Sequence, residues 1–458
     1  MIQDIINNDT ICALATPAGG AIGVIRISGP QTYPIVDRIF HPASRRPLTE
    51  GAPRTAHFGN IVTPKGDIVD EVLVTTFRAP HSYTGEDSVE ISCHGSRYIL
   101  ESVIQLLIDA GCRQARPGEY TQRAYLNGKM DLSQAEAVAD LIASTNKATH
   151  DIALGQLKGQ FSNELAQLRD KLLKITSLLE LELDFSDQDV NFADRQELLT
   201  LAETISRKIT SLAESFAKGK AIKSGIPVAI IGKTNVGKST LLNQLLHEDK
   251  AIVSDIHGTT RDVIEDTTTL HGLTFRFIDT AGIRRTTDEI ERLGIERTYR
   301  KLTEAAIVIW MIDETPSPEE IADVAARTQD KKLIVVRNKI DLHQCAADID
   351  AHQQSTLSIS AKQGTNIPLL EEAIYRAADI PEITENDVII TSARHYEALL
   401  RARQSIGRVI DGLAHHLSGD LLSEDLRQCI DELGEITGSQ ITPTEVLHSI
   451  FSHFCIGK

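Results

Sequence analysis

The sequence lacks a long apolar run, an N-terminal export signal and paired cysteines. No stretch approaches the roughly 20 apolar residues that cross a bilayer, so no membrane span is expected. The first residues, MIQDIINNDTICALAT, have no basic start followed by an apolar block, so we expect no secretory signal. The six cysteines, at positions 12, 93, 112, 345, 429 and 455, form no CxxC pair. This disfavours a structural zinc site and favours a cytoplasmic protein with free thiols.

The chain is also short of positive charge. It has 47 Lys and Arg residues against 64 Asp and Glu residues, a net charge of −17. Because Lys and Arg neutralise phosphate in non-specific binding, this balance disfavours a protein that coats nucleic acid. It leaves room for a local basic patch or for a partner that supplies one. A chain of 458 residues suggests about three domains.

The pattern of the sequence changes three times along the chain. Short β-prone runs predict strands at 21–29, 71–80 and 87–95, and a helix is expected from Tyr98 to Ala110, ended by Gly111. Apolar residues then recur at helical spacing over 130–218. Strands are expected near 228–232, 275–279, 307–312 and 333–337, alternating with helices, which is typical of a parallel sheet. Helical patterns return after Pro381.

These changes predict a multidomain protein in four segments. They are an α+β N-terminal domain (1–127), a first helical part (128–224), an inserted α/β P-loop (Ras-like) G domain (225–380) and a second helical part (381–458). Because helical tracts flank a self-contained α/β segment, we expect the two helical parts to form one α-helical bundle domain.

A phosphate-binding loop is expected at GKTNVGKS, from Gly232 to Ser239. The stretch fits G-x-x-x-x-G-K-S and lies between a strand (VAII) and a helix (TLLNQLL), the context that this motif requires. In such a loop, backbone N–H groups and the helix N-terminus bind phosphate oxygens. Lys238 is expected to reach the β- and γ-phosphates, and the Ser239 hydroxyl to bind Mg²⁺.

Three further segments follow in the order that a GTPase requires. GTTRD (258–262) offers Thr260 as a second magnesium ligand, and DTAG (279–282) places Asp279 at a strand end facing the metal, with the Gly282 N–H near the γ-phosphate. NKID (338–341) supplies Asp341, whose carboxylate accepts hydrogen bonds from guanine N1–H and N2–H₂. Adenine offers no such pair, so GTP is expected rather than ATP. Residues 360–362 (SAK) are expected to close the base pocket.

One component common among signalling GTPases is missing. Many of them place a water-positioning glutamine directly after the DTAG glycine, but Ile283 stands there and cannot hydrogen-bond to water. An arginine could complete the site, either from a partner or from the adjacent Arg284 and Arg285. Alternatively, the Asn235 side chain could ligate a monovalent cation beside the phosphates, with Glu291 holding the water through an intermediate.

The sequence resembles the MnmE (TrmE) family of tRNA-modification GTPases over essentially its full length. The resemblance is carried by ATPAGGAIGVIRISG, YTGEDSVEISCHG, RPGEYTQRAYLNGKMDLSQAEA, the whole G domain and the terminal CIGK. It implies a homodimer that acts with a flavoprotein partner, MnmG, as a heterotetramer. The pair would add an aminomethyl or carboxymethylaminomethyl group to C5 of the wobble uridine (position 34) of certain tRNAs.

The resemblance also implies potassium-stimulated GTP hydrolysis through transient pairing of G domains. It implies K⁺ ligands at Asn235, Ser254, Ile256 (backbone) and Thr259, and a catalytic acid at Glu291. The full set of expected GTP-binding residues is Asn235, Val236, Gly237, Lys238, Ser239, Thr240, Ser254, Asp255, Ile256, His257, Gly258, Thr259, Thr260, Asp279, Thr280, Ala281, Gly282, Asn338, Lys339, Asp341, Ser360, Ala361 and Lys362.

A folate site in the N-terminal domain is implied in the same way. The resemblance assigns Arg26, Glu90, Lys129 and Lys458 to 5,10-methylene- or 5-formyl-tetrahydrofolate. Cationic groups suit the glutamate tail of a folate, and a carboxylate can pair with the N–H edge of its pterin. Cys455 is left unassigned. Lys233 and Thr234 replace an Arg-Pro that is commoner in the family, and neither is expected to bind a ligand.

Two alternative functions remain open from the sequence. A ribosome-assembly GTPase would share the G domain but would not need the N-terminal folate features. A folate-binding scaffold would use GTP only to regulate assembly.

Overall fold

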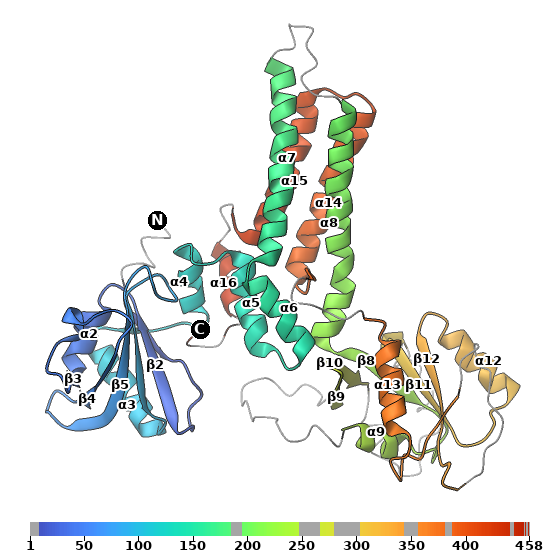
Figure 1. Ribbon diagram of the computed structural model, residues 1–458, viewed down its shortest axis with the longest axis horizontal. Helices are drawn as coiled ribbons and strands as arrows, with labels where there is room; N and C mark the ends of the chain where they lie inside the picture. Colours follow the sequence, from blue (N-terminus) through green and yellow to red (C-terminus); the bar gives the residue numbers. More distant parts are fainter. Residues whose placement is uncertain are drawn as a thin grey trace. The chain divides into compact units, whose positions relative to one another are not determined.

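The computed structural model describes residues 9–184, 195–246, 266–278, 303–342, 356–380, 387–439, 444–452, 454 and 457 (Figure 1). The chain divides into two compact units. The first comprises residues 1–142, 156–205 and 401–458, and the second comprises residues 143–155 and 206–400. Within the described ranges, no helix combines the length and the hydropathy of a membrane span.

The first unit contains a seven-stranded sheet in the order β3-β4-β5-β6-β2-β1-β7. The strands are β1 Ile11–Leu14, β2 Ile22–Ser28, β3 Phe40–Pro42, β4 Ala56–Val62, β5 Ile68–Phe77, β6 Ser88–His94 and β7 Arg113–Gln114. All neighbouring strands in this order are antiparallel except β1 and β7, which are parallel. The strands expected near 21–29, 71–80 and 87–95 are therefore confirmed as β2, β5 and β6.

Two helices cover one face of this sheet. Helices α2 (Thr32–Ile39) and α3 (Arg97–Asp109) bury Val36 and Val103 against Ile25 and Ile91 of the central strands. The predicted end of α3 is confirmed, because Ala110 caps it and Gly111 follows with φ 116°, a left-handed conformation that favours glycine. The sheet with its helices makes the N-terminal domain an α+β fold, as expected.

Two long helices precede the strands of the second sheet in the sequence, two follow them, and helices from the two groups pack together. They are α7 (Gln160–Asp184), α8 (Arg195–Ser224), α14 (Ala393–Ala414) and α15 (Gly419–Thr437). In the first unit α15 lies along α7, and Arg401 of α14 pairs with Glu432 and Glu435 of α15. In the second unit Phe216 of α8 stacks on Tyr396 of α14, with ring centroids 4.4 Å apart. The expected helical bundle, built from two separate parts of the chain, is confirmed.

Shorter helices complete the first unit. They are α4 (Glu119–Leu126), α5 (Leu132–Ala143) and α16 (Thr444–Ser452). The C-terminal α16 packs closely on the start of α4, since a Cβ added to Gly118 would meet the Phe451 carbonyl oxygen at 2.6 Å. The described end of the chain thereby returns to the N-terminal domain.

The second unit contains a six-stranded sheet in the order β13-β12-β11-β8-β10-β9. The strands are β8 Ile226–Ile231, β9 Asp266–Leu270, β10 Leu273–Phe277, β11 Ile307–Ile312, β12 Lys332–Arg337 and β13 Leu357–Ser358. All neighbouring pairs are parallel except β9 with β10. Helices α9 (Lys238–Leu246), α12 (Pro318–Arg327) and α13 (Ile367–Ala377) complete the expected α/β fold.

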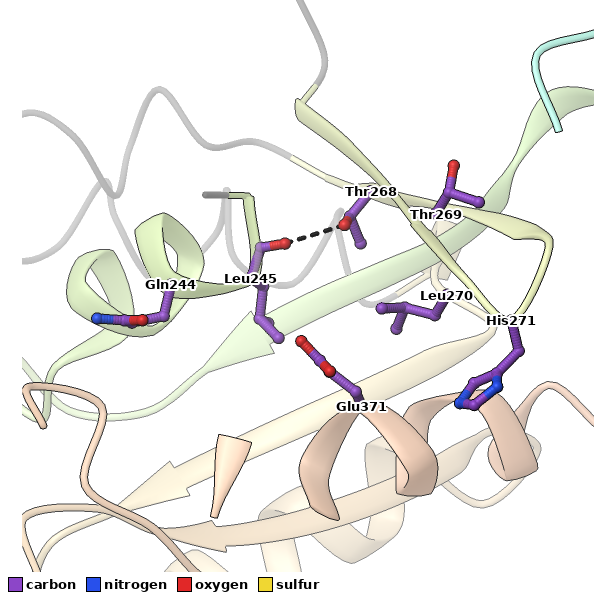
Figure 2. A pocket seen from close by; sticks show the side chains of 7 residues that line it. All are labelled: Gln244, Leu245, Thr268, Thr269, Leu270, His271 and Glu371. Atoms are coloured by element: carbon purple, nitrogen blue, oxygen red, sulfur yellow. Dashed lines mark hydrogen bonds between the residues drawn. The ribbon is translucent and has the colours of Figure 1, made fainter. Parts of the chain in front are cut away.

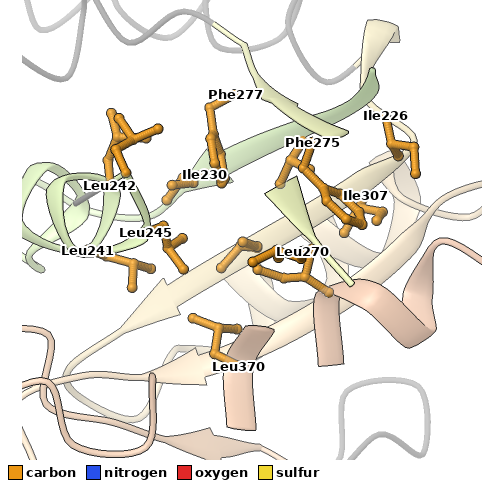
Figure 3. Packing of buried hydrophobic residues seen from close by; sticks show 14 of the residues in the cluster. Ile226, Ile230, Leu241, Leu242, Leu245, Leu270, Phe275, Phe277, Ile307 and Leu370 are labelled. Atoms are coloured by element: carbon orange, nitrogen blue, oxygen red, sulfur yellow. The ribbon is translucent and has the colours of Figure 1, made fainter. Parts of the chain in front are cut away.

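The core of this unit lies between the sheet and helices α9 and α13. Figure 3 shows Leu241 and Leu245 of α9 and Leu370 of α13 directed toward Phe275 and Ile307 of the strands. Because β8 and β11 are buried on both faces, their sequences IPVAII and IVIWMI are almost wholly apolar.

A short helix from the helical region belongs to this second core. Helix α6 (Lys147–Leu157) contributes Ala148 and Ile152 to the same cluster as Phe275. Asn146 caps α6 by accepting from the Thr149 N–H (2.8 Å), and its Nδ2 donates to Thr274 Oγ1 on β10 (2.7 Å). The Ala148 N–H donates to the carbonyl of Gly272 in the β9–β10 turn (3.3 Å). The sequence patterns do not indicate this contact, and the domain boundaries at 127, 224 and 380 remain predictions.

Substituting Asn146→Ala should loosen the β9–β10 hairpin. The change removes both the helix cap and the bond to Thr274, which together contribute about 1–2 kcal/mol. We expect hydrogen exchange of the β9 and β10 amides to accelerate by a factor of about 5–30. The neighbouring exposed Thr145→Ala is the control and should leave exchange unchanged. Unaltered exchange in Asn146→Ala would show that the contact does not hold the hairpin.

Candidate functional site

Two glycines shape the phosphate loop between β8 and α9. Gly232 and Gly237 have φ values of 148° and 102°, the region that favours glycine. A Cβ at Gly232 would lie 2.3 Å from the carbonyl oxygen of Met311, and one at Gly237 would lie 2.3 Å from Nδ2 of Asn338. The loop therefore packs too closely on the ends of β11 and β12 to accept side chains at these two positions.

Lys238 occupies the mouth of this loop. Its Nζ donates to the carbonyl oxygens of Gly232 (2.7 Å) and Lys233 (2.6 Å). Burial lowers the pKa of Lys238, because an ammonium group loses solvation there. A bound phosphate would restore a favourable environment for the charge, so the position suits the role expected for this residue.

Asn338 connects the phosphate loop with the loop expected to bind the base. Its Nδ2 donates to the carbonyl oxygen of Val236 (2.8 Å), and its Oδ1 accepts from the N–H of Ala361 (2.9 Å). Asn338 is 5% exposed, so both bonds are shielded from water. One side chain thereby sets the relative position of two loops that are more than 100 residues apart in the sequence.

The remaining residues of the base loop are held by their neighbours. Ser360 Oγ donates to Asp341 Oδ1 (2.7 Å) and accepts from the N–H of Gln363 (3.2 Å). Lys339 Nζ lies 2.7 Å from Asp313 Oδ2 at the carboxyl end of β11, and this hydrogen bond lowers the pKa of the Asp313 carboxyl group. Ser360 thus orients the carboxylate that is expected to recognise guanine.

Lys233 forms an ion pair on the outer side of the phosphate loop. Its Nζ lies 2.7 Å from Glu320 Oε1. Glu320 also closes a capping box at the start of α12, where its N–H donates to Ser317 Oγ (3.2 Å) and its carboxylate accepts from the Ser317 N–H (3.0 Å). Both members of the pair are solvent-exposed, so it contributes little stability, but it links the loop to α12.

A cavity of about 190 Å³ lies at the other end of α9 (Figure 2). It is lined by Gln244, Leu245, Thr268, Thr269, Leu270, His271 and Glu371. Helix α9 contributes Gln244 and Leu245 to this lining. Both residues lie almost two helical turns from Lys238, where the helix begins next to the phosphate loop. The lining contains a carboxylate and neither lysine nor arginine, which does not suit a triphosphate. The loops therefore remain the expected nucleotide site, and this cavity is not a candidate for it.

In the first unit, Arg26 and Glu90 form an ion pair across adjacent strands. They are direct partners in the β2–β6 register, and the Arg26 Nη2 lies 2.8 Å from Glu90 Oε1. The Arg26 guanidinium also lies near the rings of Tyr83 (5.4 Å) and Tyr120 (5.7 Å). Its Nη1 donates to the carbonyl oxygen of Gly457 (3.4 Å), so the described end of the chain reaches this pair.

Lys129 lies beside the loop that carries Tyr83. Its Nζ donates to the carbonyl oxygen of Pro80 (2.9 Å), and its side chain packs near Gly85. Asn127 Nδ2 donates to the carbonyl oxygen of Thr84 in the same loop (2.8 Å). The loop between β5 and β6 therefore contacts both Arg26 and Lys129.

A buried charge network supports this loop. Arg123 is fully buried and pairs with Glu86 (3.2 Å) and Glu119 (3.2 Å). Glu86 in turn accepts from Ser28 Oγ (2.7 Å). Burial alone would raise the pKa of Glu119, but hydrogen bonds from Arg113 and from a backbone N–H lower it to about 2. The Glu119 carboxylate is therefore ionised and paired, as a buried charge must be.

Comparison with known proteins identifies the family. Residues 10–129 match the family described as GTP-binding protein TrmE N-terminus, and residues 132–455 match the MnmE helical domain. The tRNA modification GTPase MnmE of Phocaeicola vulgatus is 56% identical over 497 residues, covering 99% of each chain. The protein of the same name from Bacteroides fragilis (strain ATCC 25285) is 57% identical over 467 residues, covering 99% of this chain and 100% of the relative.

The chain belongs to the MnmE family of tRNA modification GTPases. It is accordingly a GTPase, and the expected multidomain fold, P-loop and GTP binding are confirmed.

Solved structures of other GTPases match only a part of this MnmE-family chain. A variant of Era from Aquifex aeolicus bound to GDP and AlF₄⁻ is 30% identical, covers 39% of this chain and 66% of its own, and has a TM-score of 0.25. The FeoB G domain of Methanococcus jannaschii is 23% identical, covers 34% of this chain and 98% of its own, and has a TM-score of 0.23. The family assignment rests on the full-length relatives.

Several of the expected site residues lie outside the described part of this MnmE-family chain. They are Ser254, Asp255, Ile256, His257, Gly258, Thr259, Thr260, Asp279, Thr280, Ala281, Gly282, Glu291 and Lys458. The structure brings together the phosphate loop and the base loop, and it pairs Arg26 with Glu90. The roles of all these residues toward GTP, metals and folate remain predictions.

Sequence reasoning missed the partners of several predicted site residues. In the sequence, Glu320 and Asp313 are isolated acidic residues outside any recognised motif. No sequence pattern pairs Glu320 with Lys233 or Asp313 with Lys339. The signal that could have found Asp313 is its position directly after the apolar run IVIWMI, since residues that follow parallel strands meet at one edge of the sheet.

Substituting Asn338→Ala should weaken GTP binding without unfolding the second unit. It leaves the Val236 carbonyl and the Ala361 N–H without their partner, a cost of about 1–3 kcal/mol. We expect the Kd for a fluorescent GTP analogue to rise about 10- to 100-fold. The control is Gln363→Ala, because only the backbone N–H of Gln363 contacts Ser360. An unchanged Kd in Asn338→Ala would contradict the proposed link between the loops.

Proposed function

We propose that this chain is a potassium-stimulated GTPase that modifies C5 of the wobble uridine in certain tRNAs. Acting with the flavoprotein MnmG, it would add a carboxymethylaminomethyl or aminomethyl group, using a one-carbon unit from tetrahydrofolate. The observation that carries this proposal is the match over 99% of the chain to MnmE proteins, which includes both the N-terminal sheet and the helical bundle. A ribosome-assembly GTPase would not need these parts.

The nucleotide site fits Mg²⁺–GTP. Lys238 and the N-terminus of helix α9 would bind the phosphates, and Ser239 at that N-terminus would supply its hydroxyl to Mg²⁺. Thr260 would supply the second magnesium ligand and Asp279 would face the metal. Asp341, oriented by Ser360, would accept the two N–H groups of guanine.

The position of Asn235 fits a monovalent cation. Asn235 is exposed in the phosphate loop and has φ 61°, a left-handed conformation that asparagine tolerates. Its carboxamide oxygen could ligate K⁺ together with Ser254, Ile256 and Thr259. When bound, K⁺ would supply positive charge near the phosphates, which an arginine supplies in other GTPases. Glu291 would then orient the attacking water through an intermediate.

The Arg26–Glu90 pair fits the recognition of a folate. Nε and Nη2 of Arg26 both donate to Glu90 Oε1. The second carboxylate oxygen, Oε2, can therefore accept a hydrogen bond from the N–H edge of a pterin. Tyr83 and Tyr120 offer aromatic surface beside it. Lys129 and Lys458 would attract the carboxylates of the glutamate tail.

The proposed partners follow from this function. We propose a cytoplasmic homodimer that binds MnmG as a heterotetramer and takes tRNA as its substrate. Because the net charge is −17, either a local basic patch on this chain or the partner would have to supply the positive surface that tRNA requires.

GTP hydrolysis should be faster in K⁺ than in Na⁺ by about 10²-fold, since a preorganised positive group of this kind has an effect of that size. Asn235→Ala should remove the difference between the two salts while GTP still binds. The matched control is Thr234→Ala, an exposed neighbour in the same loop that should keep the K⁺ response. Steady-state turnover at saturating GTP measures the effect. Equal rates in K⁺ and Na⁺ for the wild type would refute the second-cation mechanism.

The tRNA of a strain that lacks this protein should lose the modified wobble uridine. Mass spectrometry of nucleosides from bulk tRNA should show its return with the wild-type chain and with Arg97→Ala, an exposed arginine paired with Glu101 on α3. Arg26→Ala should fail to restore it, because the substitution leaves Glu90 without its cation. Normal wobble nucleosides in the strain without the protein would reject the proposed function.

A further inference from the structure

The loop between β3 and β4 in the first unit carries three exposed arginines, Arg45, Arg46 and Arg54. Because β3 and β4 are antiparallel neighbours, the end of β3 and the start of β4 meet at one end of the sheet. The contact continues beyond β3, since the Ala43 N–H donates to the carbonyl oxygen of Phe58 (2.8 Å). Two of the arginines follow β3 closely and the third lies just before β4, so all three belong to this end of the sheet.

Backbone contacts hold both ends of this loop. The Arg45 N–H donates to the carbonyl oxygen of Pro42 (2.9 Å), and the Arg54 N–H donates to that of Thr76 in β5 (2.7 Å). Arg45 and Arg54 have φ values of 59° and 60°. Residues other than glycine adopt this left-handed conformation mainly where the surrounding structure requires it. Backbone hydrogen bonds, and not the guanidinium groups, therefore hold these two residues in the loop.

The middle of the loop is packed against the domain. Leu48 is fully buried, and Asp37 accepts from the backbone N–H groups of Leu48 (2.8 Å) and Thr49 (3.3 Å). Arg78 donates to the carbonyl oxygen of Thr49 (2.9 Å), and its guanidinium lies 3.5 Å from the centre of the Tyr33 ring. This fourth arginine and the Asp37 carboxylate thus support the loop, which presents the other three arginines from a fixed backbone.

The three exposed guanidinium groups have no carboxylate partner among the residues that the structure describes. By contrast, the exposed Arg97 and Arg376 each pair with a glutamate one helical turn away. The segment 43–58 contains a single carboxylate, Glu50, against three arginines. It is therefore a locally positive surface in a chain whose net charge is −17.

Unpaired guanidinium groups at the surface are suited to phosphate. Each presents N–H donors in a planar fork that matches two phosphate oxygens. Like charges at one end of a sheet repel one another, and an anionic partner would remove that cost. A ligand with several phosphates in a row would engage more than one of these groups at a time.

We propose that this loop, residues 43–55, is a tRNA-binding surface of the chain. In it, Arg45, Arg46 and Arg54 contact phosphates of the RNA backbone. The inference rests on the proposed function, which makes tRNA the substrate. Phosphate contacts fix the position of a nucleic acid without reading its sequence. The arginine loop would therefore position the tRNA, and other contacts would select which tRNA is modified.

The test is the affinity of the full-length protein for a fluorescently labelled tRNA transcript with uridine at position 34, measured by anisotropy over a range of salt concentrations. Each arginine–phosphate contact contributes about one to the slope of log Kd against log salt. The triple variant Arg45→Ala/Arg46→Ala/Arg54→Ala should lower this slope by about three and weaken binding about tenfold or more at low salt. The corresponding triple lysine variant keeps the charges and should keep most of the slope.

A matched control removes the same amount of charge elsewhere. Arg97→Ala/Arg327→Ala/Arg376→Ala replaces three exposed arginines, each of which pairs with a carboxylate one helical turn away. This variant should keep the wild-type slope, because its arginines are already neutralised. Thermal unfolding and GTP turnover should be unchanged in every variant, which reports that both units are folded.

Several results would overturn the inference. They are a wild-type slope and affinity in the triple alanine variant, an equal loss in the matched control, and no measurable binding of tRNA by the wild type. Loss of MnmG binding with unchanged tRNA binding would also overturn it, since the loop would then contact the protein partner.

The proposed function is judged separately, from the wobble nucleosides. If the wild-type chain restores them while the triple alanine variant binds tRNA normally, this inference is wrong and the proposed function stands. If the wild-type chain does not restore them, the proposed function is wrong and this inference falls with it.

Discussion

The Asn338 carboxamide is the interaction on which the nucleotide site depends. It joins the phosphate loop to the base loop through two buried hydrogen bonds, to the Val236 carbonyl and the Ala361 N–H. A triphosphate and a guanine are recognised together only if these loops keep a constant separation. The close packing at Gly237, where a Cβ would meet Asn338, serves the same constraint. On the proposed assignment, the specificity for GTP would depend on how these loops are held together at one edge of the sheet.

In the N-terminal domain, charged pairs instead of an amide side chain hold the polar groups of the candidate site in place. The Arg26–Glu90 pair lies on a sheet face, and the loop beside it is supported by the buried Arg123. Buried and paired charges hold polar groups in fixed orientations, which a flexible surface cannot do. Both candidate sites are thus built from rigid elements, with the functional groups at strand ends or on strand faces.

The parts that could be predicted from the sequence depend on local spacing. The phosphate loop, NKID and the strand–helix alternation are short patterns, and the glycine that ends α3 is one residue after the helix. The unpredicted parts join distant residues that are ordinary on their own. Examples are the contact of Asn146 with Thr274 and the pairing of Asp70 with His94. No single-sequence pattern distinguishes such an asparagine or aspartate from a solvated one.

The central claim concerns the water that attacks GTP, because Ile283 cannot orient it. We attribute this role to Glu291, aided by a monovalent cation at Asn235. Single-turnover hydrolysis by Glu291→Gln in K⁺ tests the claim most directly, since the substitution keeps the shape of the side chain and removes its charge. The account predicts a rate lower by about 10²–10⁴-fold, with GTP affinity close to that of the wild type. A wild-type rate in this variant would contradict it.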